Sequence, residues 1–574
     1  EKVVPTLKEI RKRDGTVVAF DESRIINAIM KAMRASGEGG ETEAKRVAKT
    51  VAKDLLRLVK NSPAGFLPTV EGVQDIVERQ LILHNFVNTS KAYILYRQRR
   101  SELRREKGEV PKEVRELSVD SKQYFRNQLA EFVYYSTYSK WLPEKNRRET
   151  WLETAERYVS FMRRHLGDKL TAAEYTEIKG YILEMKALGS MRLLWSAGPA
   201  VEKSNVCAYN CAYIAPAKWQ DLAEIMYVLM CGTGVGFSAE HQTVELLPII
   251  KRQMGEKLSR FVIPDSREGW ADALAHGLET WSAGKDVEFD YSQIRPQGAR
   301  LMTMGGRASG PAPLRELLEF SRQKMLSRQG RRLSTIDVHD IICKVGEVVV
   351  AGGVRRSALI SLSDLDDQEM QSAKNGQFYL NHPERSMANN SAVYNEKPTL
   401  ADFLTEWLNL VKSGSGERGI FNRGSLQQQL PARRWKLFST DCWTAGTNPC
   451  GEIVLKSKQF CNLSEVVART EDTEETLLEK VRVATILGTF QASLTNFSYL
   501  SKEWKKNCEE EALLGVSITG MWDCKAVRRP NTLRKMKEVA IEVNRKYAAR
   551  FGINPSTCIT CVKPSGNGSQ FFDS

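Results

Sequence analysis

The chain has 574 residues, a formal net charge of +14 and 42% hydrophobic residues. This length is several times that of a usual domain of about 100–150 residues, so two or three domains are expected. No run of about 18 uncharged apolar residues is present, and the first residues are charged throughout, which argues against a membrane-spanning protein and against a signal segment. The positive charge favours a polyanionic partner, either nucleic acid or nucleotide phosphates. A basic surface that is merely solvated and binds no partner would give the same net charge.

The eleven cysteines are spread over the last two thirds of the chain. This density is far below that of a small secreted protein held together by disulfides. This low density of cysteines therefore favours a reducing cytoplasm as the location of the protein.

The first hundred residues form a self-contained pattern. A short strand pattern turns at Asp14-Gly15, a helix follows with Asp21 as its N-cap, a second helix covers residues 40–59, and a third runs from about Thr69 to Arg104. Basic residues give this module a cationic face suited to a triphosphate, although a solvated surface is the alternative: Lys12, Arg13, Arg24 and Arg97.

The rest of the chain changes its pattern twice. A charged segment with a proline, residues 101–117, is typical of a linker, and residues 118–194 show amphipathic helical periodicity, clearest at 151–166 and 173–188. Beyond them, short β-rich runs alternate with helices, as in Ala212–Pro216 and Asp221–Met230. This alternation predicts a parallel α/β architecture.

The segment TNPCGEIVLKSKQFCNLSEVV places Cys450 between a proline and a glycine, two residues before Glu452 and eleven before Cys461. A hydrolytic thiolate usually requires a histidine, and none lies in this segment. Zinc is suggested by C-x₂-C at Cys558 and C-x₃-C at Cys207, but about 350 residues separate these half-sites. A third interpretation is redox chemistry, in which one cysteine is a radical or acid centre and two others are a dithiol.

The N-terminal module resembles the ATP-cone, a regulatory nucleotide-binding domain at the front of many ribonucleotide reductases. The similarity rests on KRDG, FDESRI, PTVEGVQDIV and KAYILYRQRR in that order. It implies that Lys12 and Arg13 contact phosphates, that Arg24 assists them, and that Thr69 lies beside the nucleotide. ATP and dATP are then expected to compete for this module.

From Ser136 onward the sequence is similar to the catalytic chain of ribonucleotide reductases. The motifs occur in the family's order: KALGSMRLLW, AYNCAYI, CGTGVGF, DSREGW, IRPQGARLMTMGG, AGGVRRSA, MANNSAVYNEKPTL, GERGIFN, NPCGE, CNLSE and VKPSGN. The resemblance implies a ten-stranded α/β barrel of the ribonucleotide reductase and glycyl-radical type, preceded by a helical segment and the small α+β ATP-cone. The expected domains are residues 1–104, 105–194 and 195–574.

The resemblance also implies a role for each residue of the NPCGE segment. Cys450 is expected to carry a thiyl radical that removes the ribose 3′ hydrogen, because S–H and activated C–H bonds have similar strengths. Glu452, two residues away and on the same face of an extended segment, is the expected base for the 3′-OH, and Asn448 is expected to bind the ribose hydroxyls. Cys211 and Cys461 are the expected dithiol, which becomes a disulfide during reduction.

Substrate and effector sites follow from the same resemblance. Backbone donors and small residues suit phosphates, and they are found beside Gly234 and in the loop Pro564, Ser565, Gly566, Asn567 and Gly568, where many relatives have threonine at Asn567. A glycine- and arginine-rich loop, residues 295–310, is expected to relay the identity of a bound deoxynucleotide. The expected effector contacts there are Asp265, Arg295 and Arg300.

The residues of these motifs are most similar to those of the adenosylcobalamin-dependent, class II, monomeric branch of the family. This predicts an enzyme that reduces ribonucleotides to 2′-deoxyribonucleotides for DNA synthesis, with adenosylcobalamin as cofactor, ATP, dATP and dNTP as effectors and a thioredoxin-like protein as reductant. The alternative is a class I large subunit that receives its radical from a metal-bearing small subunit. Relatives continue past the VKPSGN loop, so we expect the last strands and a tail to be missing here and a complementing chain to supply them.

Two interpretations from other classes stay open on the sequence. The charge and eleven tryptophans would suit a protein that binds nucleic acid, but the tryptophans lie singly within apolar segments, which favours core packing. An idle regulatory fragment that binds effectors alone is the other. No metal ligand set is assigned.

Overall fold

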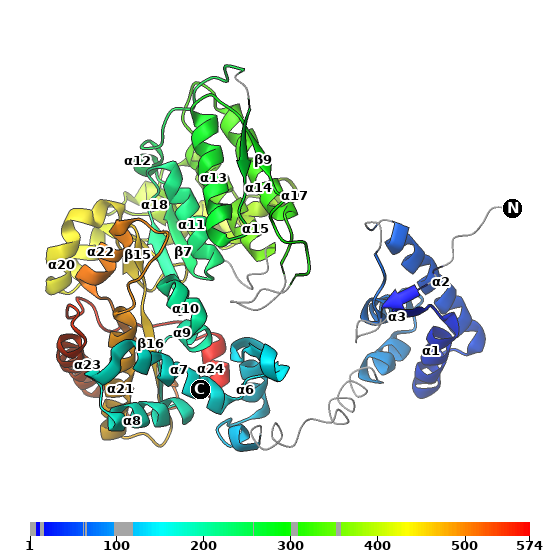
Figure 1. Cartoon of the computed structure of the whole chain (residues 1–574), viewed down its shortest axis with the longest axis horizontal. Helices are drawn as coiled ribbons and strands as arrows, with labels where there is room; N and C mark the ends of the chain where they lie inside the picture. Colours follow the sequence, from blue (N-terminus) through cyan, green and yellow to red (C-terminus); the bar gives the residue numbers. More distant parts are fainter. Residues whose placement is uncertain are drawn as a thin grey trace. The chain divides into compact units, whose positions relative to one another are not determined.

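The computed structural model describes residues 7, 9–11, 17–60, 62, 66–96, 119–255, 258–299, 308–351 and 358–574. The chain divides into two compact units, Glu1–Arg115 and Glu116–Ser574 (Figure 1). Among the helices of these described ranges, none combines the length and the apolar character that a membrane crossing requires.

The first unit pairs a two-stranded ribbon with a small helical core. Its elements are β1 (Glu9–Arg11), β2 (Val17–Ala19), α1 (Glu22–Ser36), α2 (Glu41–Lys60) and α3 (Val70–Leu83). The strands are antiparallel, and α1 begins as predicted with Asp21, whose carboxylate accepts a hydrogen bond from the Ser23 amide at 3.0 Å. Ile29, Val47 and Val51 are fully buried in the core of this unit.

The predicted third helix of this unit is shorter than expected. Helix α3 ends at Leu83, Asn85 has a φ of 65°, and helical residues resume only at 87–96, while residues 97–104 lie outside the described ranges. The prediction of one continuous helix from Thr69 to Arg104 was therefore wrong. The break falls at His84-Asn85, where the Phe86 amide bonds back to the Leu81 carbonyl.

The second unit is built on a parallel-rich sheet. Its strands lie in the order β12 (Gly419–Phe421), β11 (Ala388–Val393), β10 (Leu359–Asp364), β7 (Gly234–Ser238), β6 (Cys211–Ile214) and β15 (Gln459–Phe460). The first five are parallel, and β15 runs antiparallel to β6. Strands β6 and β7 are buried along their whole length, as expected for strands covered on both faces.

A second sheet has the order β17 (Gly515–Thr519), β16 (Leu463–Val467) and β5 (Ala187–Leu188). Strand β5 pairs antiparallel with β16, so residues 187–188 are not helical as predicted but close this sheet. On the far side of β17, Val516 bridges to Thr560. Two further ribbons pair β3 (Trp141–Leu142) with β4 (Arg147–Arg148) and β8 (Ser259–Val262) with β9 (Val287–Asp290).

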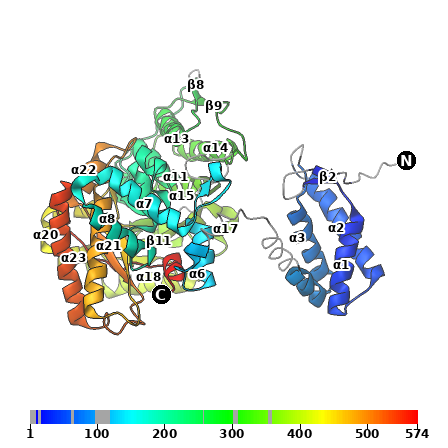
Figure 2. The same cartoon turned by 60° about the horizontal axis from the view of Figure 1, so that its bottom comes forward.

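Helices surround these sheets. They are α6 (Gln128–Val133), α7 (Trp151–Leu166), α8 (Ala172–Leu183), α9 (Met191–Ser196), α10 (Pro199–Lys203), α11 (Trp219–Met230), α12 (His241–Val244), α13 (Arg267–Ser282), α14 (Ala312–Ser327), α15 (Thr335–Ala351), α16 (Gln368–Ser372), α17 (Phe378–Asn381), α18 (Leu400–Ser413), α19 (Leu426–Gln429), α20 (Ala432–Phe438), α21 (Glu474–Ala492), α22 (Lys502–Glu511), α23 (Pro530–Phe551) and α24 (Asn567–Phe572). Helices α11 and α15 pack together against β7 and β10. Figures 1 and 2 show α13 and the β8–β9 ribbon at one end of this unit, away from α21 and α23.

The last helix of the described chain, α24, lies beside α6, although about 440 residues separate them (Figure 1). Phe571 of α24 is fully buried among Phe125, Tyr134 and Trp151, with ring centroids 6.2, 6.0 and 5.2 Å away. This aromatic cluster fixes the segment that follows the predicted phosphate loop. The predicted α/β class is thus confirmed, whereas closure of ten strands into a barrel stays a prediction.

Candidate active site

Cys450 lies at the tip of a tight hairpin. Strand β13 (Gly446–Thr447) pairs antiparallel with β14 (Val454–Leu455), and the loop between them is closed from within by buried Asn448. The Asn448 amide donates to the Ile453 carbonyl at 3.2 Å, and the Ile453 amide donates to the Asn448 side chain at 3.0 Å. Gly451 makes the turn with a φ of 86°, a conformation that favours glycine.

Two glycines of β7 give this hairpin its place. A Cβ atom on Gly236 would lie 1.9 Å from the Thr447 carbonyl oxygen, and one on Gly234 would lie 3.1 Å from the Pro449 ring. The glycines of CGTGVGF therefore allow the hairpin to lie directly on the strand. Gly234 was predicted in a turn beside the substrate, but it begins β7, where Cys211 is its partner in register.

Glu452 is held by Asn448 rather than by strand geometry. The Asn448 side-chain amide donates to the Glu452 carboxylate at 2.9 Å. Residues 449–452 form a turn, so the expectation that Cys450 and Glu452 share a face of an extended segment was wrong. The same hydrogen bond nevertheless keeps the carboxylate within the loop that carries Cys450.

Cys450, Cys211 and Cys461 converge at the edge of the large sheet. Strand β15 is antiparallel to β6, and the Cys461 amide donates to the Cys211 carbonyl at 2.9 Å. Cys211 and Cys461 are buried, whereas Cys450 is the exposed one among the chain's eleven cysteines, all of which lie in described ranges. The Cys211 thiol lies close enough to the other two thiols for each of them to shift its pKa. The structure thus brings together three residues that span 250 positions.

The surroundings of Cys450 and Cys211 favour the protonated form of their thiols. The hydrogen bond to Cys211, burial and the nearby Glu452 charge raise the pKa of Cys450. At Cys211 the hydrogen bond from Cys450 lowers the pKa, but the bond to Cys461, burial and the charges of Cys461 and Glu452 outweigh it and raise the pKa well above its usual value. Nucleophilic catalysis and zinc binding both use the thiolate. These S–H groups are instead suited to hydrogen-atom transfer.

The predicted phosphate loop lies along β16. Gly566 has a φ of 52°, and α24 begins directly after it at Asn567. Buried Glu465 of β16 accepts hydrogen bonds from the Lys563 ammonium at 2.5 Å and from the Ser565 hydroxyl at 2.6 Å. The Gly568 amide donates to the Ser565 carbonyl at 2.9 Å. The loop is therefore tied to the sheet by a carboxylate.

Three residues of this region were missed by sequence reasoning. Lys563 and Glu465 anchor the phosphate loop, and Lys563 is close enough to Cys450 to affect its pKa. The third is Cys561, whose pKa is raised to about 12, first by burial and then by the charge of Glu452. Lys563 and Cys561 directly precede the predicted loop, so its flanking sequence could have indicated them.

The predicted effector residues are only partly described. Lys12, Arg13 and Arg300 lie outside the described ranges. In the first unit, Arg24 is exposed and 3.4 Å from the Asp21 carboxylate, and Thr69 caps α3 by accepting a bond from the Gly72 amide at 3.1 Å.

In the second unit the predicted effector residues Asp265 and Arg295 meet. The Arg295 guanidinium donates to the Asp265 carboxylate at 2.8 Å. They therefore form one charged group near the start of α13.

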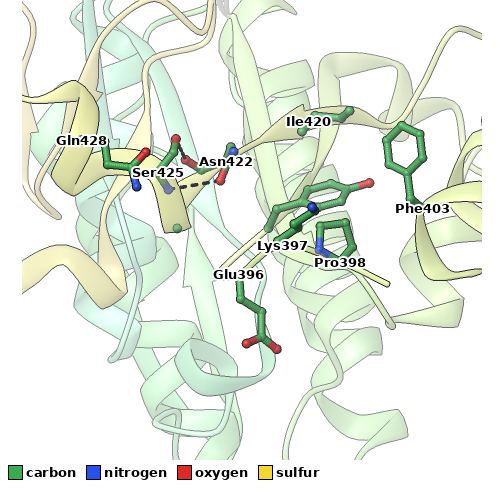
Figure 3. A pocket seen from close by; sticks show the side chains of 10 residues that line it. Glu396, Lys397, Pro398, Phe403, Ile420, Asn422, Ser425 and Gln428 are labelled. Atoms are coloured by element: carbon green, nitrogen blue, oxygen red, sulfur yellow. Dashed lines mark hydrogen bonds between the residues drawn. The ribbon is translucent and has the colours of Figure 1, made fainter. Parts of the chain in front are cut away.

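Other clusters and hollows lie away from Cys450. Within the described ranges, one group of three residues has the spacing of a metal site, Asp340, His382 and Glu384, but Arg385 and Lys324 already pair with Asp340, each at 2.8 Å. Figure 3 shows a hollow beside the edge strand β12, lined by Lys397, Phe403, Ile420 and Asn422 among others. No predicted site residue lines this hollow.

Comparison with known families finds matches in three separate segments of the chain. Residues 8–102 match the ATP cone domain, residues 112–199 the ribonucleotide reductase alpha domain, and residues 249–323 the insertion domain of B12-dependent ribonucleotide reductase. The chain is thus similar to the ribonucleotide reductases. The insertion-domain match covers the β8–β9 ribbon, α13 and most of α14, the end of the second unit described above.

Similar proteins match most of the length of this chain. The adenosylcobalamin-dependent ribonucleoside-triphosphate reductase of Lactobacillus helveticus (strain DPC 4571) is 28% identical over 539 residues, covering 76% of this chain and 71% of the relative. The protein of the same name from Euglena gracilis is 29% identical and covers 77% of this chain and 62% of the relative. A crystal structure of a B12-dependent, class II ribonucleotide reductase superposes with a TM-score of 0.64 at 22% identity, covering 80% of this chain and 76% of that one. The fold is therefore that of a class II reductase.

Proposed function

We propose that this reductase converts ribonucleotides to 2′-deoxyribonucleotides with Cys450 as the hydrogen-atom carrier and Cys211 and Cys461 as the reducing dithiol. One observation carries the proposal: an exposed, protonated thiol lies on a buried pair of thiols, next to a carboxylate. Nucleophilic or metal chemistry requires a thiolate, whereas this arrangement keeps the hydrogen on sulfur.

The proposed cofactor is adenosylcobalamin, the group that appears in the names of the relatives. The residues present fit it in one respect, because Cys450 is exposed at the hairpin tip while its partner cysteines are buried. The exposed residues of the hairpin, Cys450 and Gly451, would face the cofactor. When bound, adenosylcobalamin supplies a carbon-centred radical. A metal-bearing small subunit, as in class I enzymes, is the alternative radical source.

Each side chain of the hairpin then has a part in removing the 2′-OH of the ribose. As a thiyl radical, the Cys450 sulfur takes the 3′ hydrogen atom, a nearly balanced exchange of S–H for C–H. The Glu452 carboxylate accepts the proton of the 3′-OH, which helps the 2′-OH to leave as water. Asn448 orients Glu452 through the 2.9 Å hydrogen bond and keeps the loop closed.

The dithiol completes the reaction. Cys211 and Cys461 together give two electrons and two protons: one proton leaves with the 2′ oxygen as water, the other proton and the two electrons supply the new hydrogen on C2′, and the sulfurs join as a disulfide. Cys450 then returns its hydrogen atom to C3′. A thioredoxin-like dithiol protein is the proposed source of the electrons that restore the pair, which places the enzyme in a reducing compartment such as the cytoplasm.

The remaining site residues are assigned to phosphates and effectors. Pro564, Ser565, Gly566, Asn567 and Gly568, with Gly234 beside the hairpin, are proposed to hold the substrate, a ribonucleoside triphosphate by analogy with the relatives' names. Lys12, Arg13, Arg24 and Thr69 are proposed to bind ATP or dATP. Asp265, Arg295 and Arg300 are proposed to bind a deoxynucleotide effector.

Two variants test this function in the full chain supplied with adenosylcobalamin and a dithiol. Cys450→Ser is expected to bind nucleotide but to form no deoxynucleotide, because an O–H bond is much stronger than S–H. Cys461→Ala retains Cys450 but loses a reductant, so it is expected to release free base without deoxynucleotide. The control is Cys524→Ser, which replaces another buried cysteine.

Product formation and base release are followed by chromatography. Full activity of Cys450→Ser would refute the proposal. Activity of the unmodified chain that requires a separate metal-bearing subunit instead of adenosylcobalamin would favour the class I alternative.

A further inference from the structure

A second pair of thiols lies on the segments that lead into β6 and β7. Cys207 belongs to the 3₁₀ turn η4 (Asn205–Ala208), and Cys231 directly follows α11. Both side chains are fully buried. The Arg267 guanidinium lies 3.3 Å from the Cys207 sulfur and 3.1 Å from the Cys231 sulfur, so one nitrogen atom joins the two.

Hydrogen bonds to backbone carbonyls hold the segments that carry Cys207 and Cys231 together. The Thr233 hydroxyl lies 3.2 Å from the Val206 carbonyl and 2.9 Å from the Tyr209 carbonyl, and the Gly234 amide donates to the Asn210 carbonyl at 2.9 Å. These bonds link the residues next to Cys207 with those that follow Cys231. The two thiols are therefore held as close neighbours by the folded chain.

The charges around the pair are positive. Arg267 is the first residue of α13, which packs beside α11 (Figure 1). Arg192 donates to the Cys231 carbonyl, in a space that a side chain at Gly232 would fill, and Lys140 is near enough to interact with Cys207. Among the described residues, no carboxylate forms a salt bridge with Arg267, whose hydrogen-bond partners are the two sulfurs.

The two thiols differ in their protonation. The hydrogen bond from Cys231 lowers the pKa of Cys207 and, with the charges of Arg267 and Arg192, outweighs burial. Burial first, and then the hydrogen bond to Cys207, raise the pKa of Cys231 well above its usual value. A thiol with a lowered pKa thus lies beside one with a raised pKa, which is the arrangement of an attacking and a resolving cysteine.

We propose that Cys207 and Cys231 are a site of oxidation by hydrogen peroxide, separate from the catalytic dithiol. The Cys207 thiolate attacks one peroxide oxygen and becomes a sulfenic acid, releasing hydroxide. The Cys231 thiol then displaces the sulfenic oxygen as water, and a disulfide forms. Because both sulfurs are buried, a small oxidant reaches them whereas a protein disulfide does not.

Oxidation changes the electrostatics of Arg267. A disulfide carries no charge, so the guanidinium loses the thiolate that neutralises it, and a partly buried cation without a partner is costly. Arg267 follows Asp265 by two residues, and Asp265 is paired with Arg295. We therefore expect oxidation to loosen the segment from 259 to 299, which contains α13 and this ion pair.

Peptide mass spectrometry of the full chain tests the linkage. Trypsin places Cys207 and Cys211 in the peptide 204–218, Cys231 in 219–251 and Cys461 in 459–469. After peroxide treatment we expect a crosslink between 204–218 and 219–251 that persists in Cys211→Ser. A crosslink to 219–251 that disappears in Cys211→Ser would overturn the proposal, as would the absence of any such crosslink.

Variants separate the two chemical steps. Cys231→Ser is expected to stop at a Cys207 sulfenic acid that a 1,3-diketone probe labels, and Cys207→Ser is expected to leave Cys231 unlabelled. At pH 7 an activated thiol has roughly tenfold or more thiolate than an ordinary one. Cys207 should therefore be labelled about tenfold faster than buried Cys524. Equal labelling rates for Cys207 and Cys524 would contradict the proposal.

Amide hydrogen exchange reads the structural consequence without depending on catalysis. We expect exchange in residues 259–299 to rise several-fold on oxidation of the unmodified chain and to stay constant in Cys207→Ser. Arg267→Gln should raise this exchange in the reduced protein as well. Unchanged exchange in the oxidised, crosslinked chain would show that the pair does not control this segment.

Discussion

The position of Cys450 depends on the absence of a side chain at Gly236, which makes Gly236→Ala a sharp perturbation. The added Cβ would lie 1.9 Å from the Thr447 carbonyl oxygen and 3.0 Å from Ile360 Cγ2. Carbon atoms do not approach backbone oxygens this closely, and no rotamer change can move a backbone atom. The hairpin must therefore withdraw from β7 by roughly 1 Å.

Both stability and turnover should respond. Overpacking of this kind typically costs about 1–3 kcal/mol of unfolding free energy. A displacement of about 1 Å in a positioned catalytic group can lower turnover on the order of a hundredfold. Gly180→Ala in α8 is the control, because an added Cβ there has nothing within 4 Å, and it should stabilise the protein by about 0.5–1 kcal/mol.

Urea unfolding followed by circular dichroism gives the first quantity, and deoxynucleotide formation gives the second. The rate of Cys450 alkylation, measured by peptide mass spectrometry, reports whether the tip has moved. If Gly236→Ala matched the unmodified protein in all three measurements, the hairpin would not depend on its contact with β7.

Three further predictions concern other parts of the chain. Oxidation after turnover should join Cys211 to Cys461, and peptide mapping that finds both thiols free in the oxidised enzyme would contradict the dithiol role. Hydrogen bonds from Arg550 lower the pKa of Glu174 to about 2. The contribution of this pair to the free energy of unfolding is therefore present above about pH 4.5 and is lost as the pH falls towards 2. Glu174→Gln lacks this contribution, so its free energy of unfolding should fall less in acid than that of the unmodified protein. ATP and dATP should compete in calorimetry of the full chain, and Arg24→Ala should weaken both about fivefold, whereas independent binding would refute a shared site.

Local signals predicted local structure well. The start of α1 follows from Asp21, and residues 151–166 coincide with α7, where Thr150 and Glu153 form a capping box that the sequence spells out. The end of α3 was missed because His84-Asn85 contains neither glycine nor proline, and Asn85 adopts a positive φ that few residues adopt. Residues 187–188 follow a helical pattern, but pairing with β16 overrides it.

The candidate site was less accessible to such reasoning. Nothing local brings Cys211 to Cys461 or places Asn448 against Glu452, since these contacts follow from sheet order and from a turn. The family resemblance supplied the partners, and the structure adds how they are held. The group of Cys207, Cys231 and Arg267 has no motif, because its members come from three elements and become neighbours only in the fold.

The two cysteine clusters show how the groups around a thiol can shift its pKa in opposite directions. Bonded to the Cys211 thiol, and with the Glu452 carboxylate nearby, Cys450 has a raised pKa and retains its hydrogen, as the proposed radical carrier must. Bonded to the Cys231 thiol, and with the Arg267 guanidinium nearby, Cys207 has a lowered pKa, as a peroxide-reactive thiol must. If the charges decide this difference, then Glu452→Gln should lower the pKa of Cys450 and speed its alkylation, whereas Arg267→Gln should raise the pKa of Cys207 and slow its oxidation. Alkylation and peroxide rates measured against pH in the two variants would separate this electrostatic control from simple burial, which neither substitution alters greatly.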